Sequence, residues 1–303
     1  MRMFYDRLIS GGVLIWLLSI SVCSFANIKI VSITEDFSSI AKEIGQDKVS
    51  IISLVKGSRN LHNITPKPSM VYKLKSADML IRLGMKQDSW IDGLIQVAKN
   101  PNVIPGSTGY IDASNGIEKL EVPTGKIDGR SGDVHIEGNP HYWLDPRNGI
   151  IIGETIKDRL ISIDPKNESF YENNFNQFKN KIEKKYIGWL DQFKKINNQT
   201  VITYHKVWPY FFKAFGLSSI GELEPLPGIP PSAKHLSNLS SELKRSQNSI
   251  LVLSTMYYPE GVGKSFAKHI NGTYKNVSVN VGEYGISNYE ELFDYLAKEL
   301  TTY

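Results

Sequence analysis

Residues 167–197 contain no proline and a single glycine, so they can form one uninterrupted helix. Their large apolar residues recur at intervals of three and four, as expected for one buried face: Phe170, Tyr171, Phe175, Phe178, Ile182, Tyr186, Trp189, Leu190 and Phe193. A helix of about 30 residues is about 45 Å long. It is long enough to run along two packed lobes, and the sequence on its two sides must supply the surfaces that cover its apolar face.

On both sides of this helix, short β-branched runs alternate with helical segments. We expect strands at 28–33, 49–54, 79–83, 200–204, 250–254 and 277–281. We expect helices at 35–45, 67–75, 90–99, 208–215, 232–245, 261–270 and 289–300. Alternation of this kind is typical of βαβ units and parallel sheets. The sequence therefore predicts an α/β fold with two lobes, each a mostly parallel sheet flanked by helices: an N-terminal lobe (27–165), a rigid linking helix (166–198) and a C-terminal lobe (199–303).

The first 26 residues have the layout of a secretory signal peptide. Arg2 and Arg7 precede an uncharged apolar run, and Ser24-Phe25-Ala26 places small residues before a cleavage point. We expect cleavage after Ala26 and a periplasmic mature protein; an N-terminal membrane anchor or lipidation at Cys23 are the alternatives. Because Cys23 is the only cysteine, cleavage removes thiolate ligands and thiol nucleophiles from the possible chemistry.

The composition excludes some further classes of function. Hydrophobic residues make up 41% and charged residues 22% of the 303 residues, which is typical of a globular protein. The formal net charge is only +4, and the basic residues are interspersed with acidic ones. This charge pattern argues against nucleic acid as a partner. We also expect the protein to be a monomer.

Three of the six histidines share a sequence context. His62 and His141 lie in polar loops just before helices, and His205 follows an expected strand. In parallel sheets, ligands gather at the carboxyl ends of the strands, where such loops converge. Neutral imidazoles there suit a borderline-soft ion such as zinc. His235 and His269 fall on expected helices, where a structural or exposed role is the simpler interpretation.

Around these histidines the sequence resembles the zinc/manganese substrate-binding proteins of ABC importers, over essentially the whole mature chain. Three blocks carry the resemblance, in order. The first is Gly57, His62, Pro66, Pro68, Ser69, Ala77 and Asp78. The second is His141, Trp143, Leu144, Asp145 and Pro146, and the third is His205, Tyr210, Phe211 and Phe212.

The resemblance implies a metal site between the lobes with His62, His141 and His205 as ligands. It implies an acidic fourth ligand from the last third of the chain, for which Glu283 is the best-placed candidate and a water the alternative. In relatives, three imidazoles with one carboxylate go with Zn²⁺, whereas Mn²⁺ sites have more carboxylates. The implied function is capture of Zn²⁺ and delivery to the membrane permease of an ABC importer. A manganese-binding protein, a surface adhesin and a metal buffer are the alternatives.

Two other interpretations concern the histidines. Residues 123–140 are rich in Gly and Pro and predict a mobile surface loop, in which His135 with Asp133 and Glu137 could form an auxiliary metal site. A three-histidine zinc site with an open position could also activate water in a hydrolase. The sequence has no HExxH motif, and the resemblance implies a closed four-ligand site. We therefore expect a binding protein and not an enzyme.

Overall fold

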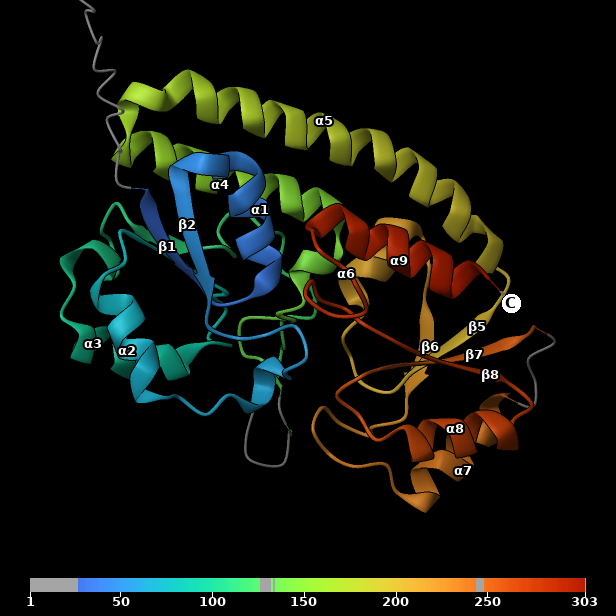
Figure 1. Cartoon of the computed structure of the whole chain (residues 1–303). Coiled ribbons are helices and arrows are strands. Elements are labelled where there is room, and N and C mark those ends of the chain that lie inside the picture. Colours follow the sequence, from blue (N-terminus) through green and yellow to red (C-terminus); the bar gives the residue numbers. More distant parts are fainter. Residues whose placement is uncertain (1–26, 126–131, 133, 244–247, 303) are drawn as a thin grey trace, which may run out of the picture.

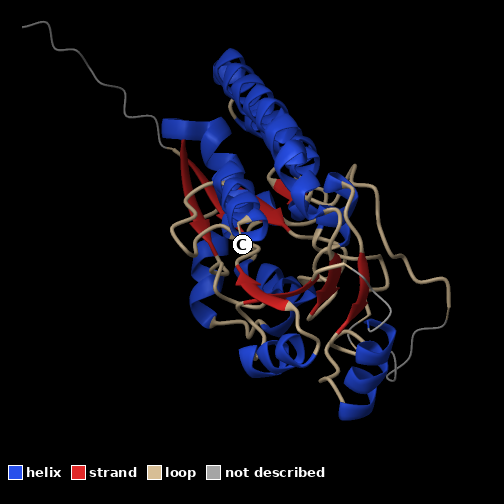
Figure 2. Cartoon of the chain, turned by 90° about the vertical axis from the view of Figure 1, so that its right-hand side faces the viewer, coloured by secondary structure: helices blue, strands red, loops and turns tan. Residues whose placement is uncertain are grey.

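Two parallel sheets form the centres of two lobes in the computed structural model, which describes residues 27–125, 132, 134–243 and 248–302 (Figures 1 and 2). The N-terminal sheet has the strand order β2-β1-β3-β4 and the C-terminal sheet the order β6-β5-β7-β8. The N-terminal strands are β1 (Ile28–Ser32), β2 (Val49–Ser53), β3 (Met79–Arg82) and β4 (Tyr110–Asp112). The C-terminal strands are β5 (Thr200–Thr203), β6 (Ser219–Glu222), β7 (Ile250–Thr255) and β8 (Thr273–Val277). All strand pairs are parallel, which confirms the expected fold class.

Helices connect successive strands and cover the sheets. The N-terminal lobe has α1 (Glu35–Gly45), α2 (Pro68–Lys75), α3 (Asp92–Ala98) and α4 (Pro146–Ile163). The C-terminal half has α6 (Pro209–Phe215), α7 (Ala233–Leu243), α8 (Glu260–His269) and α9 (Tyr289–Thr301). At the start of α4, Asp145 accepts a hydrogen bond from the backbone N–H of Arg147 and Pro146 takes the first helical position. The cleavage point after Ala26 and part of the 123–140 loop lie outside the described residues.

The long helix α5 (Glu168–Phe193) runs along both lobes (Figure 1). It packs against α1 and α4 of the N-terminal lobe and against α6 and α9 of the C-terminal half. Short 3₁₀ turns, Pro165–Asn167 and Lys194–Ile196, extend it at each end. Its buried side chains include Phe178, Ile182 and Trp189, all on the face expected from the sequence.

The prediction of a strand at 277–281 is wrong, because β8 ends at Val277 and the chain then leaves the sheet. Ser278 forms two hydrogen bonds with the backbone of Asn280. Its hydroxyl donates to the Asn280 carbonyl (2.9 Å) and accepts from the Asn280 N–H (3.2 Å). Such side chain–backbone bonds compete with strand pairing. The alternation of valine with polar residues comes from a buried loop in which Val279 and Val281 point into the core. The short strands β4 and β6 were not expected.

Within the described ranges, no helix has both the length and the apolar character that spanning a membrane requires.

The apolar face of α5 should carry much of the stability of the lobe pair. Ile182 is 0% exposed, and Ile182→Ala should lower the free energy of unfolding by about 2–5 kcal/mol, because it leaves a cavity between helices. Ile187 is 71% exposed on the same helix, and Ile187→Ala should change this free energy by less than about 0.5 kcal/mol. Urea unfolding of the two variants measures the difference; equal losses would contradict the assignment of the buried face.

Candidate metal centre

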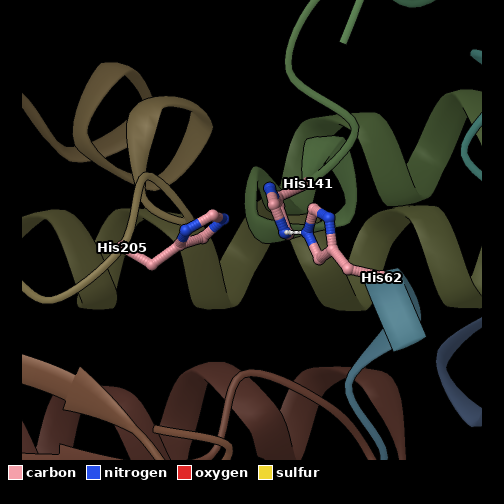
Figure 3. A group of neighbouring side chains, drawn as sticks. All are labelled: His62, His141 and His205. Carbon is pink, nitrogen blue, oxygen red and sulfur yellow. Dashed lines mark hydrogen bonds between the residues drawn. The ribbon is translucent and has the colours of Figure 1, made fainter. Parts of the chain in front are cut away.

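His62, His141 and His205 meet at the junction of the two lobes (Figure 3). His62 lies in a 3₁₀ turn (Leu61–Asn63) beyond β2, and His141 immediately precedes the turn that leads into α4. His205 follows the end of β5 by two residues. One ligand nitrogen from each ring lies within 4.8 Å of the other two. The structure thus brings together three residues that are 79 and 64 positions apart along the chain.

The spacing of the nitrogens suits a metal ion. Nε2 of His62 and Nε2 of His141 are 3.4 Å apart. Zinc–nitrogen bonds of about 2.0–2.1 Å in a tetrahedron place two ligand nitrogens about 3.3–3.4 Å apart. The His205 ring is 5.2 Å from the His62 ring and 6.0 Å from the His141 ring, centroid to centroid. Two of the three nitrogens therefore already have the separation of neighbouring ligands, and a small approach of His205 would complete a three-nitrogen face.

Hydrogen bonds fix the orientation of two of the rings. Nδ1–H of His141 donates to the side-chain oxygen of Asn139 (2.9 Å), which also accepts from the His141 backbone N–H (3.0 Å). Nδ1–H of His205 donates to the Glu224 carboxylate (2.6 Å). In both rings, Nε2 is therefore the nitrogen without the proton and is available to a metal. Partners of this kind hold ligating histidines in one tautomer and orientation.

Burial keeps the His141 ring uncharged. His141 is buried, and its burial, together with the neighbouring rings of His62, His205 and His135, holds the pKa of His141 well below its usual range. Because only neutral imidazole binds a metal, His141 need not release a proton at neutral pH. The Glu224 carboxylate beside His205 is also buried, and it accepts a second hydrogen bond from the backbone N–H of Gly228 (3.0 Å).

A cavity of about 220 Å³ opens beside the histidines and is lined by both lobes. His135, Asn139 and His141 line it from the N-terminal lobe, and His205 and Glu224 from the C-terminal lobe. An ion pair between Lys206 and Glu121 (2.9 Å) crosses from one lobe to the other at its wall. Burial also raises the pKa of Glu222 in this wall.

The remaining residues considered as ligands lie outside the group of three. Glu283 lies in a turn in which the Gly282 N–H donates to the Ile286 carbonyl (2.9 Å) and the Ile286 N–H to the Glu283 carbonyl (2.8 Å). Its carboxylate is not among the ligand atoms that converge in the described part of the chain, so its role as fourth ligand stays a prediction. His235 is on α7, where its ring contacts the Glu222 carbonyl, and His269 ends α8.

His135, the histidine of the 123–140 loop, lies beside the three converging histidines. The His135 ring is 5.0 Å from the His62 ring, whereas Glu137 forms ion pairs with Lys119 (3.3 Å) and Lys86 (3.7 Å). Asp133 lies outside the described residues. Glu137 is thus engaged by two lysines, and the auxiliary metal site stays a prediction.

Sequence reasoning missed Asn139 and Glu224. Asn139 could have been noticed two residues before His141, where a side-chain amide readily bonds to the backbone N–H and ring of the histidine. Glu224 follows the end of β6 by two residues, as His205 follows β5, and Thr203 is paired with Glu222 across these adjacent strands. The contact thus depends on a strand that was not expected from the sequence.

The model of the family described as "Zinc-uptake complex component A periplasmic" matches residues 30–303. The chain belongs to this family. The description is that of an uptake component, so the chain is a binding protein and not an enzyme.

Relatives named for different metals match this chain. It is 28% identical over 198 residues to the manganese ABC transporter substrate-binding lipoprotein PsaA of Streptococcus pneumoniae, covering 63% of this chain. The match spans only 60% of the length of that relative. It is 26% identical over 234 residues to the iron ABC transporter substrate-binding lipoprotein MtsA of Streptococcus pyogenes, covering 75% of this chain and 72% of the relative.

Solved structures share the fold. A crystal structure of ZnuA has a TM-score of 0.75 with 22% identity, covering 90% of this chain and 99% of that one. A Mn-bound periplasmic metal-binding protein from Candidatus Liberibacter asiaticus has a TM-score of 0.73 with 19% identity, covering 90% and 98%. At this level of identity the likeness concerns the two-lobed architecture.

Removal of the Glu224 carboxylate should weaken metal binding through His205. Glu224→Ala should lower zinc affinity by about 10–100-fold, because the ring loses the hydrogen bond that sets its tautomer and orientation. Glu222→Ala is the matched control, since it removes a carboxylate from the same cavity wall without touching that bond. Titration against a competing chelator measures both. Equal losses in the two variants would show that the charge of the wall matters and the hydrogen bond does not.

Proposed function

We propose that the protein captures Zn²⁺ outside the cytoplasmic membrane, in the periplasm, and delivers it to the permease of an ABC importer. The observation that carries this proposal is the convergence of three histidine nitrogens, two of them 3.4 Å apart, between lobes of a chain in a metal-uptake family. A single ion bound there would join residues of both lobes. Metal binding would thereby hold the lobes in one defined arrangement, which a permease can recognise.

The donor set favours zinc over the metals in the relatives' names. Three neutral imidazoles form a nitrogen-rich site, whereas Mn²⁺ prefers oxygen ligands. Zinc also lies above manganese and iron(II) in intrinsic affinity for a given set of ligands. The relatives named for manganese and iron support metal transport in general, and the histidines of this chain favour zinc as its cargo.

A fourth ligand would complete the tetrahedron, and the sequence favours Glu283 or a water for this position. A carboxylate would lower the charge of the site from +2 to +1. The Glu283 carboxylate is not part of the converging group in the described part of the chain, so its role rests on the resemblance alone.

Alanine at any of the three histidines should lower zinc affinity by at least about tenfold, since each substitution removes a ligand nitrogen. His235→Ala is the control, because His235 lies on α7 outside the site. Calorimetry with a competing chelator, applied to the mature protein, measures the dissociation constants. Affinity in the wild type should fall in acidic solution, since protonated imidazole cannot bind metal, and the lowered pKa of His141 keeps that ring neutral at neutral pH.

Two results would contradict this function. Near-wild-type zinc affinity in two of the three histidine variants would exclude the site. Manganese binding as tight as zinc binding would leave the site standing and exclude the proposed preference for zinc.

A further inference from the structure

Asn280 lies in the segment between β8 and α9, where the C-terminal half returns to the N-terminal lobe. The backbone on either side of it is held by that lobe: the Trp143 indole N–H donates to the Val279 carbonyl (2.8 Å), and the Val281 N–H donates to the Asp36 carboxylate (2.9 Å). Only 3% of Asn280 is exposed. Its side chain is therefore fixed at the interface of the lobes.

The orientation of the amide follows from its neighbours. Nδ2 donates to the Gly57 carbonyl (3.3 Å) and to the Tyr257 hydroxyl, which in turn donates to the same Gly57 carbonyl (2.8 Å). A flipped amide would set its oxygen against the Gly57 carbonyl, so the nitrogen belongs on this side. Oδ1 is left buried, with no hydrogen-bond partner. A buried carbonyl oxygen without a partner is uncommon and calls for an explanation.

Asn280 borders the same small cavity as two of the histidines. His62, His141, Tyr258 and Asn280 all line it, and the ring of Tyr258 stacks on that of His205 (5.3 Å between centroids). An amide oxygen is an acceptor with two lone pairs and can bind a cation directly. A metal ion held by the histidine nitrogens would supply the partner that Oδ1 lacks.

We propose that Oδ1 of Asn280 is an oxygen ligand of the metal ion bound by His62, His141 and His205. This inference rests on the proposed metal-capture function and identifies the residue that completes the site. Asn280 belongs to the segment that the N-terminal lobe holds through Trp143 and Asp36, so its position at the interface of the lobes is fixed.

A neutral fourth ligand has a consequence for selectivity. Three imidazoles and an amide leave the bound ion with its full charge of +2, and none of these four ligands is a carboxylate that would favour a harder cation. Hard ions such as Mn²⁺ prefer carboxylate oxygens, so the amide contributes to discrimination against manganese. A carboxylate placed at the same atom position should reduce that discrimination.

The test compares Asn280→Asp with Asn280→Leu in the mature protein, using zinc and manganese separately in chelator competition. Asn280→Asp, which keeps the shape of the side chain, should raise manganese affinity relative to zinc by about tenfold or more. Asn280→Leu removes the oxygen and should weaken zinc binding about tenfold. The melting temperature of each metal-free variant shows whether the fold is retained.

Asn276→Asp is the matched control, because it makes the same change of charge four residues earlier on β8, beside Glu260. A manganese-to-zinc ratio that changes no more in Asn280→Asp than in Asn276→Asp would overturn the ligand assignment. So would a loss of zinc affinity in Glu283→Gln with none in Asn280→Leu. Either result leaves the function intact if the histidine variants still lose zinc; insensitivity of zinc binding to the histidines would remove the function itself.

Discussion

Three imidazole rings packed together between two lobes are the feature on which the rest of the structure depends. Their nitrogens can converge only because the Nδ1–H groups of His141 and His205 are turned away, toward Asn139 and Glu224. Nε2 of each ring then faces the common centre. Burial disfavours the charged form of His141, which keeps its nitrogen in the state that binds a metal.

The scaffold brings these rings together from distant parts of the sequence. Parallel sheets place their loops at the carboxyl ends of the strands, and each lobe contributes such loops to the junction. The helix α5 packs against elements of both halves, and the segment that contains Asn280 bonds directly to the N-terminal lobe. The N-terminal lobe thus contacts both the start and the end of the C-terminal half, which limits how far the lobes can separate.

Much of this arrangement could be predicted from the sequence, because periodicity and local motifs carry it. The buried face of α5 follows the spacing of its aromatic residues, and the Asp145-Pro146 pair marks the start of α4. The three histidines were identified from their loops and from the motifs around them. What could not be predicted depends on long-range pairing: the contact of Glu224 with His205 requires β5 and β6 to be adjacent. The buried loop at 278–281 has the alternating pattern of a strand, and only its local hydrogen bonds distinguish it.

X-ray absorption at the zinc edge, on the mature protein loaded with one equivalent of Zn²⁺, would show directly which atoms bind the ion. We expect a four-coordinate ion with three imidazole nitrogens at about 2.0–2.1 Å and one oxygen ligand. The multiple-scattering signal of imidazole should decrease by about one third in His205→Ala, since one of three rings is lost. A spectrum dominated by oxygen ligands, or one unchanged by that substitution, would contradict a metal site built on these three histidines.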